Sequence, residues 1–517
     1  MQRRHLLLSS AAALALPSLS HAAPRTEGTA AAQAQAMAAG RLTAERLVQD
    51  YLSRIAALDK AGPRLNSVIE LNPEARAIAL ALDAERRAGK LRGPLHGIPV
   101  LLKDNIATGD RMHTTAGSLA LADLRVARDA HLVQRLRAAG AVILGKTNLS
   151  EWANMRSTRS VSGWSGRGGL TRNPYALDRS CSGSSSGTGA AIAADLATLG
   201  VGTETDGSIV SPASICGLVG LKPTLGRISR DGVIPIAHSQ DTAGPMTRTV
   251  ADAALLYAAM CGPDAADAVT QAAPDAAGQL DAGLIKGARL GVARNYFTGF
   301  DEADAAIELA IAKLRELGAE IVDNADLPAA TAYGDAETLV LLYELKEDLG
   351  QWLKTFAPGH RVQSLADVIA FNAAHRSQEM PWFGQELFEK AQALGDLSTP
   401  AYREALAACA KGAREEGLDK ALKAQRLDAL IAPTGGLAWL IDPVASDHYG
   451  ASFSTPAAVA GYPHLTVPAG FVRGLPLGLS FVGPAWSEWK LLSLGLAFEQ
   501  ATKHRRAPAF AKRTVPL

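Results

Sequence analysis

The sequence predicts an α/β fold in which helices cover both faces of a large, mixed and mostly parallel twisted sheet. Short apolar runs such as 98–102 and 141–144 are typical of buried strands, and segments with apolar residues three or four positions apart separate them. This alternation favours a sheet with both faces covered. A third observation is the almost entirely helical pattern of residues 335–425, which predicts a helical insertion.

The N-terminus is predicted to be a twin-arginine signal peptide of 22 residues, followed by one domain over residues 23–517. Two arginines, at positions 3 and 4, precede an apolar segment at 6–19, and 20–22 is a small-x-small cleavage site. The apolar segment is too short to cross a bilayer, which disfavours the alternative of an uncleaved anchor. The expected location is the periplasm or the external medium.

The first half of the domain shows clear helix boundaries. A helix begins after Thr43, a residue type that caps helices, and carries apolar residues at positions 47, 51, 55 and 58. A second helix starts at Asn72-Pro73-Glu74 and stops at Gly89. We expect residues 98–102 to form a strand, with Lys103 directly at its end.

Another helix lies before the strand at 141–144, and we expect Asp129 to cap it and Gly140 to terminate it. Farther along, residues 263–283 are rich in Ala, Asp and Gly and predict a surface loop. The later elements are predicted as strands at 289–293, 319–322, 427–434, 462–468 and 478–483, and as helices at 304–317 and 488–501.

The composition disfavours several classes of protein. The net charge is +1 and no basic run stands out, so neither nucleic acid nor an anionic membrane is an expected partner. Eleven histidines without H-E-x-x-H, and four cysteines without metal-binding spacing, give no support for a metal site or cofactor. We expect buried, unbonded cysteines, although Cys181 and Cys216 flank the same region and a bond between them is an open alternative.

The stretch 180–224 carries the most specific chemistry. It contains Gly183-Ser184-Ser185-Ser186-Gly187, an Ala-rich helical segment, a short apolar strand and then a second turn, Asp206-Gly207-Ser208. Glycine and serine in such turns are also common in linkers. The apolar flanks argue against a linker here and predict two packed turns that each present a serine.

These residues resemble the signature of the amidase signature family, hydrolases with a Ser, cis-Ser, Lys triad. The likeness extends from about Arg41 to about Thr502 and includes Gly97-Ile98-Pro99-Val100-Leu101-Leu102-Lys103-Asp104-Asn105. It implies Lys103 as the base, Ser184 as the relay after a cis peptide bond, and Ser208 as the nucleophile. It also implies the family's sheet, inserted helices near the cleft and no cofactor.

The resemblance implies further roles around the triad. The main-chain amides of Thr205, Asp206, Gly207 and Ser208 are expected to bind the oxyanion. Supporting positions are Gly183, Ser185 and Thr203. In the reaction that the family performs, the nucleophile attacks an amide carbonyl, forms an acyl-enzyme and releases ammonia.

The substrate is expected to be a small-molecule or peptide amide, with the C-terminal amide of a peptide as the first choice. Many family members have glycine at the position of Asp206 and, at that of Val210, an arginine that can hold an acidic substrate. Their absence disfavours acidic amides and a tRNA-dependent amidotransferase subunit. Members that act on peptide amides share Asp206 and Val210. The sequence leaves the oligomeric state open.

Three alternatives remain at this point. A broad-specificity aliphatic or aryl amidase would use the same triad. An exported solute-binding protein is similar in length, but binding gives no reason for the lysine and serine pattern. A Ser-His-Asp hydrolase would use His96, His113 or His238, yet no G-x-S-x-G motif surrounds Ser208.

Overall fold

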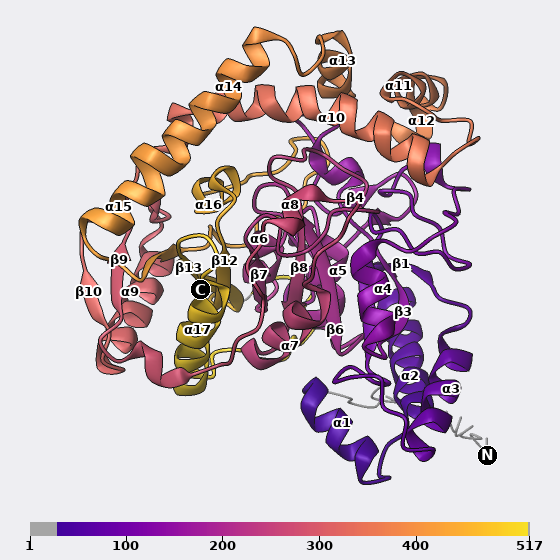
Figure 1. Ribbon diagram of the computed structural model, residues 1–517, viewed down its shortest axis with the longest axis horizontal. Coiled ribbons are helices and arrows are strands. Elements are labelled where there is room, and N and C mark those ends of the chain that lie inside the picture. The colour runs from indigo at the N-terminus through magenta and orange to yellow at the C-terminus, as the bar shows by residue number, and fades with distance from the viewer. Residues whose placement is uncertain (1–27, 515–517) are drawn as a thin grey trace, which may run out of the picture.

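The sheet organises the whole molecule. The computed structural model describes residues 28–514, so the predicted signal peptide lies outside the described residues. In these residues eleven strands form one sheet in the order β1-β3-β2-β6-β8-β7-β12-β13-β11-β9-β10 (Figure 1). The strands are β1 (Val68–Leu71), β2 (Pro99–Lys103), β3 (Val142–Thr147), β6 (Leu199–Glu204), β7 (Val219–Lys222), β8 (Thr242–Thr247), β9 (Arg289–Val292), β10 (Glu320–Val322), β11 (Ala429–Pro433), β12 (His464–Val472) and β13 (Leu475–Val482). Two further short strands, β4 (Trp164–Ser165) and β5 (Gly169–Leu170), pair with each other.

The sheet is mixed, as predicted. Pairing is parallel in two groups, β3-β2-β6 and β11-β9-β10. The other neighbours in the described sheet are antiparallel, so antiparallel pairs are more frequent than predicted. One reason is the hairpin of β12 and β13, whose two-residue turn places Arg473 at φ 51° and Gly474 at φ 81°. Positive φ at both positions is typical of the tight turn that joins antiparallel strands.

Helices cover both faces of the sheet, which confirms the predicted fold class. On β12, Leu465 faces α17, because a Cβ added at Gly495 of that helix would lie 2.6 Å from its side chain. The next residue, Thr466, points to the opposite face, where Gly478 of β13 lies against Ser214 of α6. The helices before the insertion are α1 (Ala30–Ala38), α2 (Ala44–Arg54), α3 (Ala75–Arg87), α4 (His131–Ala138), α5 (Ser186–Ala193), α6 (Val210–Ile215), α7 (Val250–Met260), α8 (Ala268–Gln271) and α9 (Asp301–Glu316).

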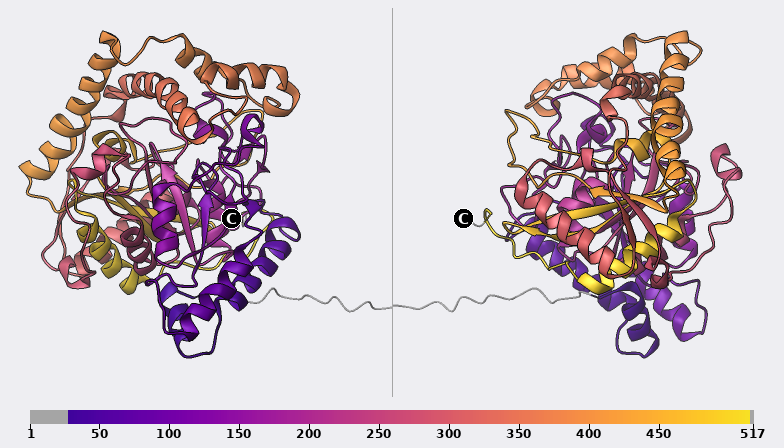
Figure 2. Two further views of the ribbon diagram at one scale, coloured as in Figure 1. Left: turned by 45° about the vertical axis from the view of Figure 1, so that its right-hand side comes forward. Right: turned by 90° about the vertical axis from the view of Figure 1, so that its left-hand side faces the viewer.

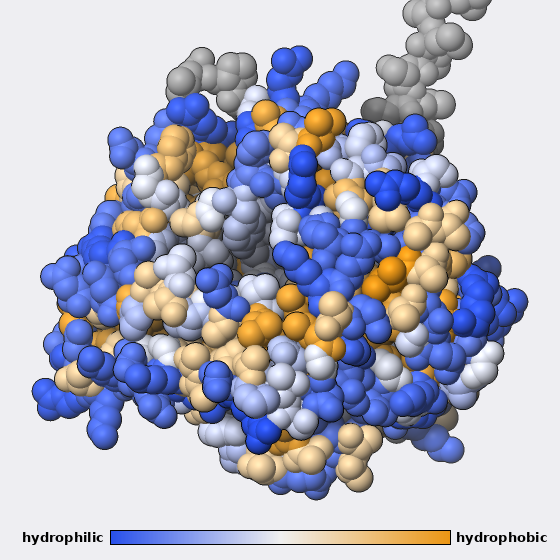
Figure 3. Space-filling model, turned by 90° about the horizontal axis from the view of Figure 1, so that it is seen from above, coloured by the Kyte–Doolittle hydropathy of each residue, from blue (hydrophilic) through white to orange (hydrophobic). Residues whose placement is uncertain are grey.

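The helices of the 335–425 segment form an arch above the sheet in Figure 1, from the side of β9 and β10 to the side of β1, and are drawn in orange in Figures 1 and 2. They are α10 (Gly334–Phe356), α11 (Leu365–Ala374), α12 (Arg376–Glu379), α13 (Glu386–Ala393), α14 (Pro400–Ala410) and α15 (Asp419–Ala424), and α16 (Thr455–Ala460) and α17 (Glu488–Thr502) follow. Seen from above, the surface is mostly hydrophilic and hollowed near the centre of the view (Figure 3). Within residues 28–514 no helix has the length and apolar character needed to span a membrane.

Local sequence signals succeed at some boundaries and fail at others. The hydroxyl of Thr43 accepts from the Arg46 amide at 3.0 Å, so the predicted cap of α2 is present. The predicted Asp129 cap of α4 is wrong, because that helix begins two residues later and has no side-chain cap. Asp129 instead accepts from the Gly109 amide, 20 positions earlier, at 2.7 Å and from Arg137 of α4 at 2.9 Å.

Candidate active site

Three side chains from separate elements meet below the surface. Lys103 is the last residue of β2, Ser184 lies two residues before α5, and Ser208 lies between β6 and α6. The Lys103 Nζ is 2.7 Å from the Ser184 Oγ, and the Ser184 Oγ is 3.0 Å from the Ser208 Oγ. The peptide bond between Gly183 and Ser184 is cis. The structure therefore brings the three residues into one hydrogen-bonded chain.

The lysine end of this hydrogen-bonded chain is fully buried. Lys103 is fully buried, and burial lowers its pKa from 10.5 to about 7, against the opposing effects of the negative charges of Asp241 and Glu204. The Lys103 Nζ also lies 3.2 Å from the main-chain oxygen and 2.9 Å from the Oγ1 of Thr203. A lysine in this environment is neutral for a large share of the time at neutral pH.

Two of the predicted supporting residues contact each other beside the lysine. The Ser185 hydroxyl donates to the Thr203 carbonyl at 3.1 Å, and the Thr203 amide donates to the Ser185 Oγ at 3.3 Å. Sequence reasoning missed Asn105, whose side-chain amide donates to the Thr203 Oγ1 at 3.0 Å. Gly183 has no room for a side chain, because an added Cβ would lie 2.2 Å from the Ser150 Oγ.

The turn at 205–208 presents main-chain donors. In the part of the chain that the structure describes, the amides of Asp206, Gly207 and Ser208 have no hydrogen-bond acceptor. Gly207 has a φ of 76°, which glycine adopts without strain. Three neighbouring N–H groups without acceptors next to a serine hydroxyl are suited to binding a negatively charged oxygen.

Two buried carboxyl groups hold this turn in place, and neither was singled out from the sequence. Glu204 accepts from the amides of Ile209, at 2.7 Å, and Val210, at 3.0 Å, at the start of α6. Asp241 accepts from the Thr205 hydroxyl at 2.5 Å and from two amides in the preceding loop. Glu204 lies within the stretch 180–224 and Asp241 lies outside it, and only the folded chain reveals the partners of the two acids.

A cavity of about 470 Å³ opens at Ser208. Its walls come from distant parts of the chain, including Leu341 of α10 and Leu387 of α13 in the helical insertion. The lining residues are Ala153, Asn154, Met155, Ser157, Thr158, Ser160, Ser162, Ser182, Gly183, Thr205, Asp206, Ser208, Ile236, Leu341, Leu387, Ser446, Asp447, Tyr449, Ser452, Ser454 and Thr455. The insertion thus forms part of the wall around the serine.

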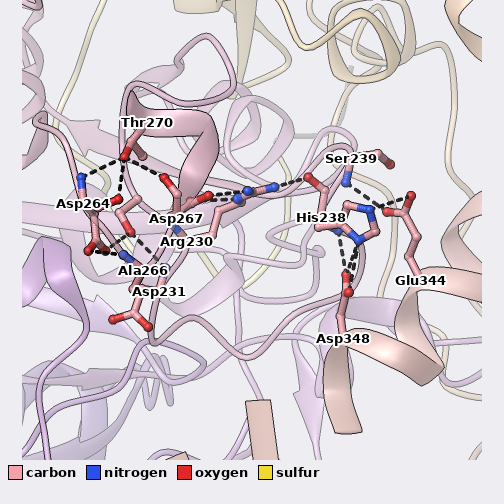
Figure 4. A network of polar contacts seen from close by, with 11 residues as sticks. Arg230, Asp231, His238, Ser239, Asp264, Ala266, Asp267, Thr270, Glu344 and Asp348 are labelled. Atoms are coloured by element: carbon pink, nitrogen blue, oxygen red, sulfur yellow. Dashed lines mark hydrogen bonds and ion pairs between the residues drawn. The ribbon is translucent and has the colours of Figure 1, made fainter. Parts of the chain in front are cut away.

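The three histidines considered from the sequence are engaged elsewhere. His96 contacts the Leu82 carbonyl at 2.9 Å, and His113 contacts Glu70 at 2.8 Å. The His238 ring contacts Asp348 of α10 at 2.9 Å (Figure 4). None of the three lines the cavity, so the structure gives no support for histidine catalysis.

His238, Glu344 and Asp348 are also the described side chains that come closest to a metal-binding group, with ligand atoms within 4.8 Å of one another. Figure 4 shows that they join the loop before β8 to helix α10. The Ser239 amide donates to Glu344 at 2.9 Å, and Arg230 donates to the His238 carbonyl. Through these contacts the three side chains connect the helical insertion to the loop before β8.

The four cysteines at positions 181, 216, 261 and 409 are buried and unbonded. Burial, together with the neighbouring thiol of Cys216, raises the pKa of the Cys181 thiol well above its usual value. This agrees with the expectation of small buried residues.

The fold, the buried lysine and the two serines define an amide hydrolase, and comparison with known proteins identifies its family. Residues 46–492 match the family model described as Amidase, and the chain therefore belongs to the amidase signature family. It is an amide-hydrolysing enzyme. The alternative of a solute-binding protein is thereby excluded.

Individual relatives are similar over almost their entire length. The chain is 53% identical to the native peptide amidase from Stenotrophomonas maltophilia, with a TM-score of 0.90 over 94% of this chain and 99% of that one. It is 52% identical to the peptide amidase PAM in complex with the competitive inhibitor chymostatin, with a TM-score of 0.91 over 93% and 99% of the two chains. A probable amidase of Arabidopsis thaliana is 40% identical over 91% of this chain and 89% of its own length.

Proposed function

We propose that this amidase removes the amide from the C-terminus of peptides and releases ammonia through an acyl-enzyme. The observation that carries the chemistry is the hydrogen-bonded chain from Lys103 through Ser184 to Ser208 at the floor of the cavity. The choice of substrate is supported by the similarity, above 50% identity, to proteins described as peptide amidases.

The reaction begins with a neutral lysine. Its two N–H groups donate to the carbonyl and hydroxyl oxygens of Thr203, and its lone pair accepts from the Ser184 hydroxyl. Ser184 can then accept the proton of Ser208. This arrangement lets Ser208 lose its proton as it attacks the amide carbon, with Ser184 passing a proton to Lys103.

The attack produces a tetrahedral intermediate whose oxygen is negatively charged. The amides of Asp206, Gly207 and Ser208 donate to this oxygen. The proton held by Lys103 returns through Ser184 to the leaving nitrogen, the C–N bond breaks and ammonia departs. Water then attacks the ester on Ser208 by the same proton route, which yields a carboxylate and restores the free serine.

We also propose that the enzyme acts outside the cytoplasm, a proposal supported by the paired arginines and cleavage site of residues 1–22. Export of the full-length chain fused to a reporter would test it. Replacement of both arginines by lysine should retain the fusion in the cytoplasm, and continued export would contradict the proposal.

A panel of amides tests the reaction and the substrate together. Ammonia and the new carboxylic acid are quantified after incubation with N-acyl dipeptide amides, aliphatic amides and aryl amides. We expect the peptide amides to give the highest kcat/KM and Ser208→Ala to abolish turnover. A fluorophosphonate probe should label the wild type but not this variant. Turnover of aliphatic or aryl amides alone would favour the broad-specificity alternative, and release of no ammonia from any peptide amide would refute the proposal.

A further inference from the structure

The charges around the cavity are all of one sign. Among the described residues that line it, Asp206 and Asp447 are the only ones that are Asp, Glu, Lys, Arg or His. Arg159 and His448 belong to the same loops, but neither lines the cavity. A ligand in this cavity therefore meets two carboxyl groups and no cationic side chain among the described lining residues, since Lys103 lies behind Ser184 and Ser208 and does not line the cavity.

The two acids have no basic side chain within ion-pair distance in the described residues, and the influences of Lys222 on Asp206 and of His448 on Asp447 only partly oppose burial, which raises the pKa of both carboxyl groups. Thr455 donates to Asp206 at 2.6 Å, whereas Asp447 accepts from the Ser162 amide at 3.0 Å and from the Trp439 ring nitrogen at 3.0 Å. No ion pair involves either acid in the part of the chain described. Whether either group is ionised or protonated, it offers no positive charge to compensate a carboxylate brought beside it.

Two kinds of molecule would bring such a carboxylate. One is a peptide amide whose last residue is glutamate or aspartate. The other is the product of the reaction, because hydrolysis converts a neutral carboxamide into an anion within the cavity. The amides of residues 206–208 can donate to one oxygen of either the amide or the acid, but a carboxylate adds a negative charge beside Asp206 and Asp447, whereas a neutral amide does not.

We propose that this cavity selects against carboxylates, so that it disfavours acidic residues next to the scissile amide and expels its own product. The inference rests on the proposed function and specifies the charge of the peptide amides that the enzyme accepts. Neutral and basic last residues are accepted, acidic ones are rejected, and the product acid binds more weakly than the amide from which it forms.

Matched amides test the first part. N-acetyl-Met amide and N-acetyl-Glu amide have side chains of similar length, and N-acetyl-Lys amide supplies the opposite charge. We expect kcat/KM to be at least tenfold lower for N-acetyl-Glu amide than for N-acetyl-Met amide. For N-acetyl-Lys amide, kcat/KM should equal or exceed the value for N-acetyl-Met amide. Equal values for methionine and glutamate would overturn the proposal.

Variants then assign the effect to the cavity. The test uses the ratio of kcat/KM for N-acetyl-Met amide to kcat/KM for N-acetyl-Glu amide. This ratio should fall at least threefold in Asp447→Asn and, separately, in Asp206→Asn. The ratio is taken within each variant, so a general loss of turnover cancels. Asp396→Asn is the control, because it removes an exposed carboxylate that does not line the cavity and should leave the ratio unchanged. An equal change in the control would also overturn the proposal.

Binding to Ser208→Ala tests the second part without turnover. Calorimetry should show that N-acetyl-Met amide binds at least tenfold more tightly than N-acetyl-Met, and Asp206→Asn in this background should reduce the difference. Equal affinities, or no binding of either compound, would refute the charge selection. If the wild-type enzyme hydrolyses no peptide amide but this preference in binding is present, then the proposed function fails and the charge selection stands.

Discussion

The strongest test of the proton route is the pH dependence of catalysis. With a pKa of about 7, half of the Lys103 side chains are neutral near pH 7 and about 1% at pH 5. The kcat/KM for N-acetyl-Met amide, which does not titrate in this range, should therefore fall about 100-fold between its plateau near pH 9 and pH 5. Lys103→Met should lower kcat/KM at least about 10³-fold and remove the transition near pH 7.

The same pKa predicts an effect on stability with a definite sign. The fall from 10.5 to about 7 on folding corresponds to about 5 kcal/mol of unfavourable burial of the charged form. Between these two pH values the unfolded chain binds the extra proton, so the free energy of unfolding of the wild type should rise with pH. Lys103→Met lacks this contribution, and its stability relative to the wild type should decline as the pH rises from 7 to 10.

The assay follows the N-acetyl-Met product by liquid chromatography from pH 5 to 9, and circular dichroism confirms that the protein stays folded. Urea unfolding of both proteins at pH 7 and pH 10 supplies the stability difference. A profile that is flat down to pH 5, or one with its midpoint near 10, would refute the neutral base. Retention of more than a tenth of the activity by Lys103→Met would mean that the proton takes another route.

Three other predictions follow from particular contacts. Gly183→Ala should lower both kcat/KM, at least tenfold, and the melting temperature, because its Cβ would lie 2.2 Å from the Ser150 Oγ. Thr203→Val removes a hydroxyl 2.9 Å from the lysine nitrogen and should lower kcat about tenfold at pH 9, with KM little changed. The contact with Asp348 raises the pKa of His238, so its stabilisation is complete below pH 6.5 and lost as the pH rises through the folded-state value. His238→Asn should therefore lower the melting temperature at pH 6 more than at pH 9.

Local patterns were enough to predict most of the elements that hold the site. The apolar run 98–102 corresponds to β2, and the glycine-flanked serines fall in turns on either side of α5 and β6. These predictions succeed because a buried strand and a tight turn each leave a signal within a few residues. The strand β1, with only four residues and a half-exposed pattern, leaves too weak a signal and was not predicted.

Contacts between distant segments could not be predicted from the sequence. Nothing near Asp241 indicates that it accepts from Thr205, 36 positions earlier, and the spacing of Leu341 and Leu387 does not show that both face the cavity. The predominance of antiparallel neighbours in the sheet has the same origin, because strand order depends on which distant segments pair. Motifs therefore located the three residues of the proposed proton route, whereas their buried neighbours could be found only in the folded chain.

The acidic side chains around the site affect both the pKa of Lys103 and the kind of ligand that the cavity is expected to bind. Burial alone would lower the pKa of Lys103 further, because Asp241 and Glu204 oppose it. A base is most effective when its pKa lies near the working pH, since it is then both available and strong. The two acids hold Lys103 near that point from behind the turn, while Asp206 and Asp447 line the cavity in front of it. The described lining also offers a product carboxylate no cationic side chain, so we expect the same site that uses a neutral lysine to release the carboxylate that it forms.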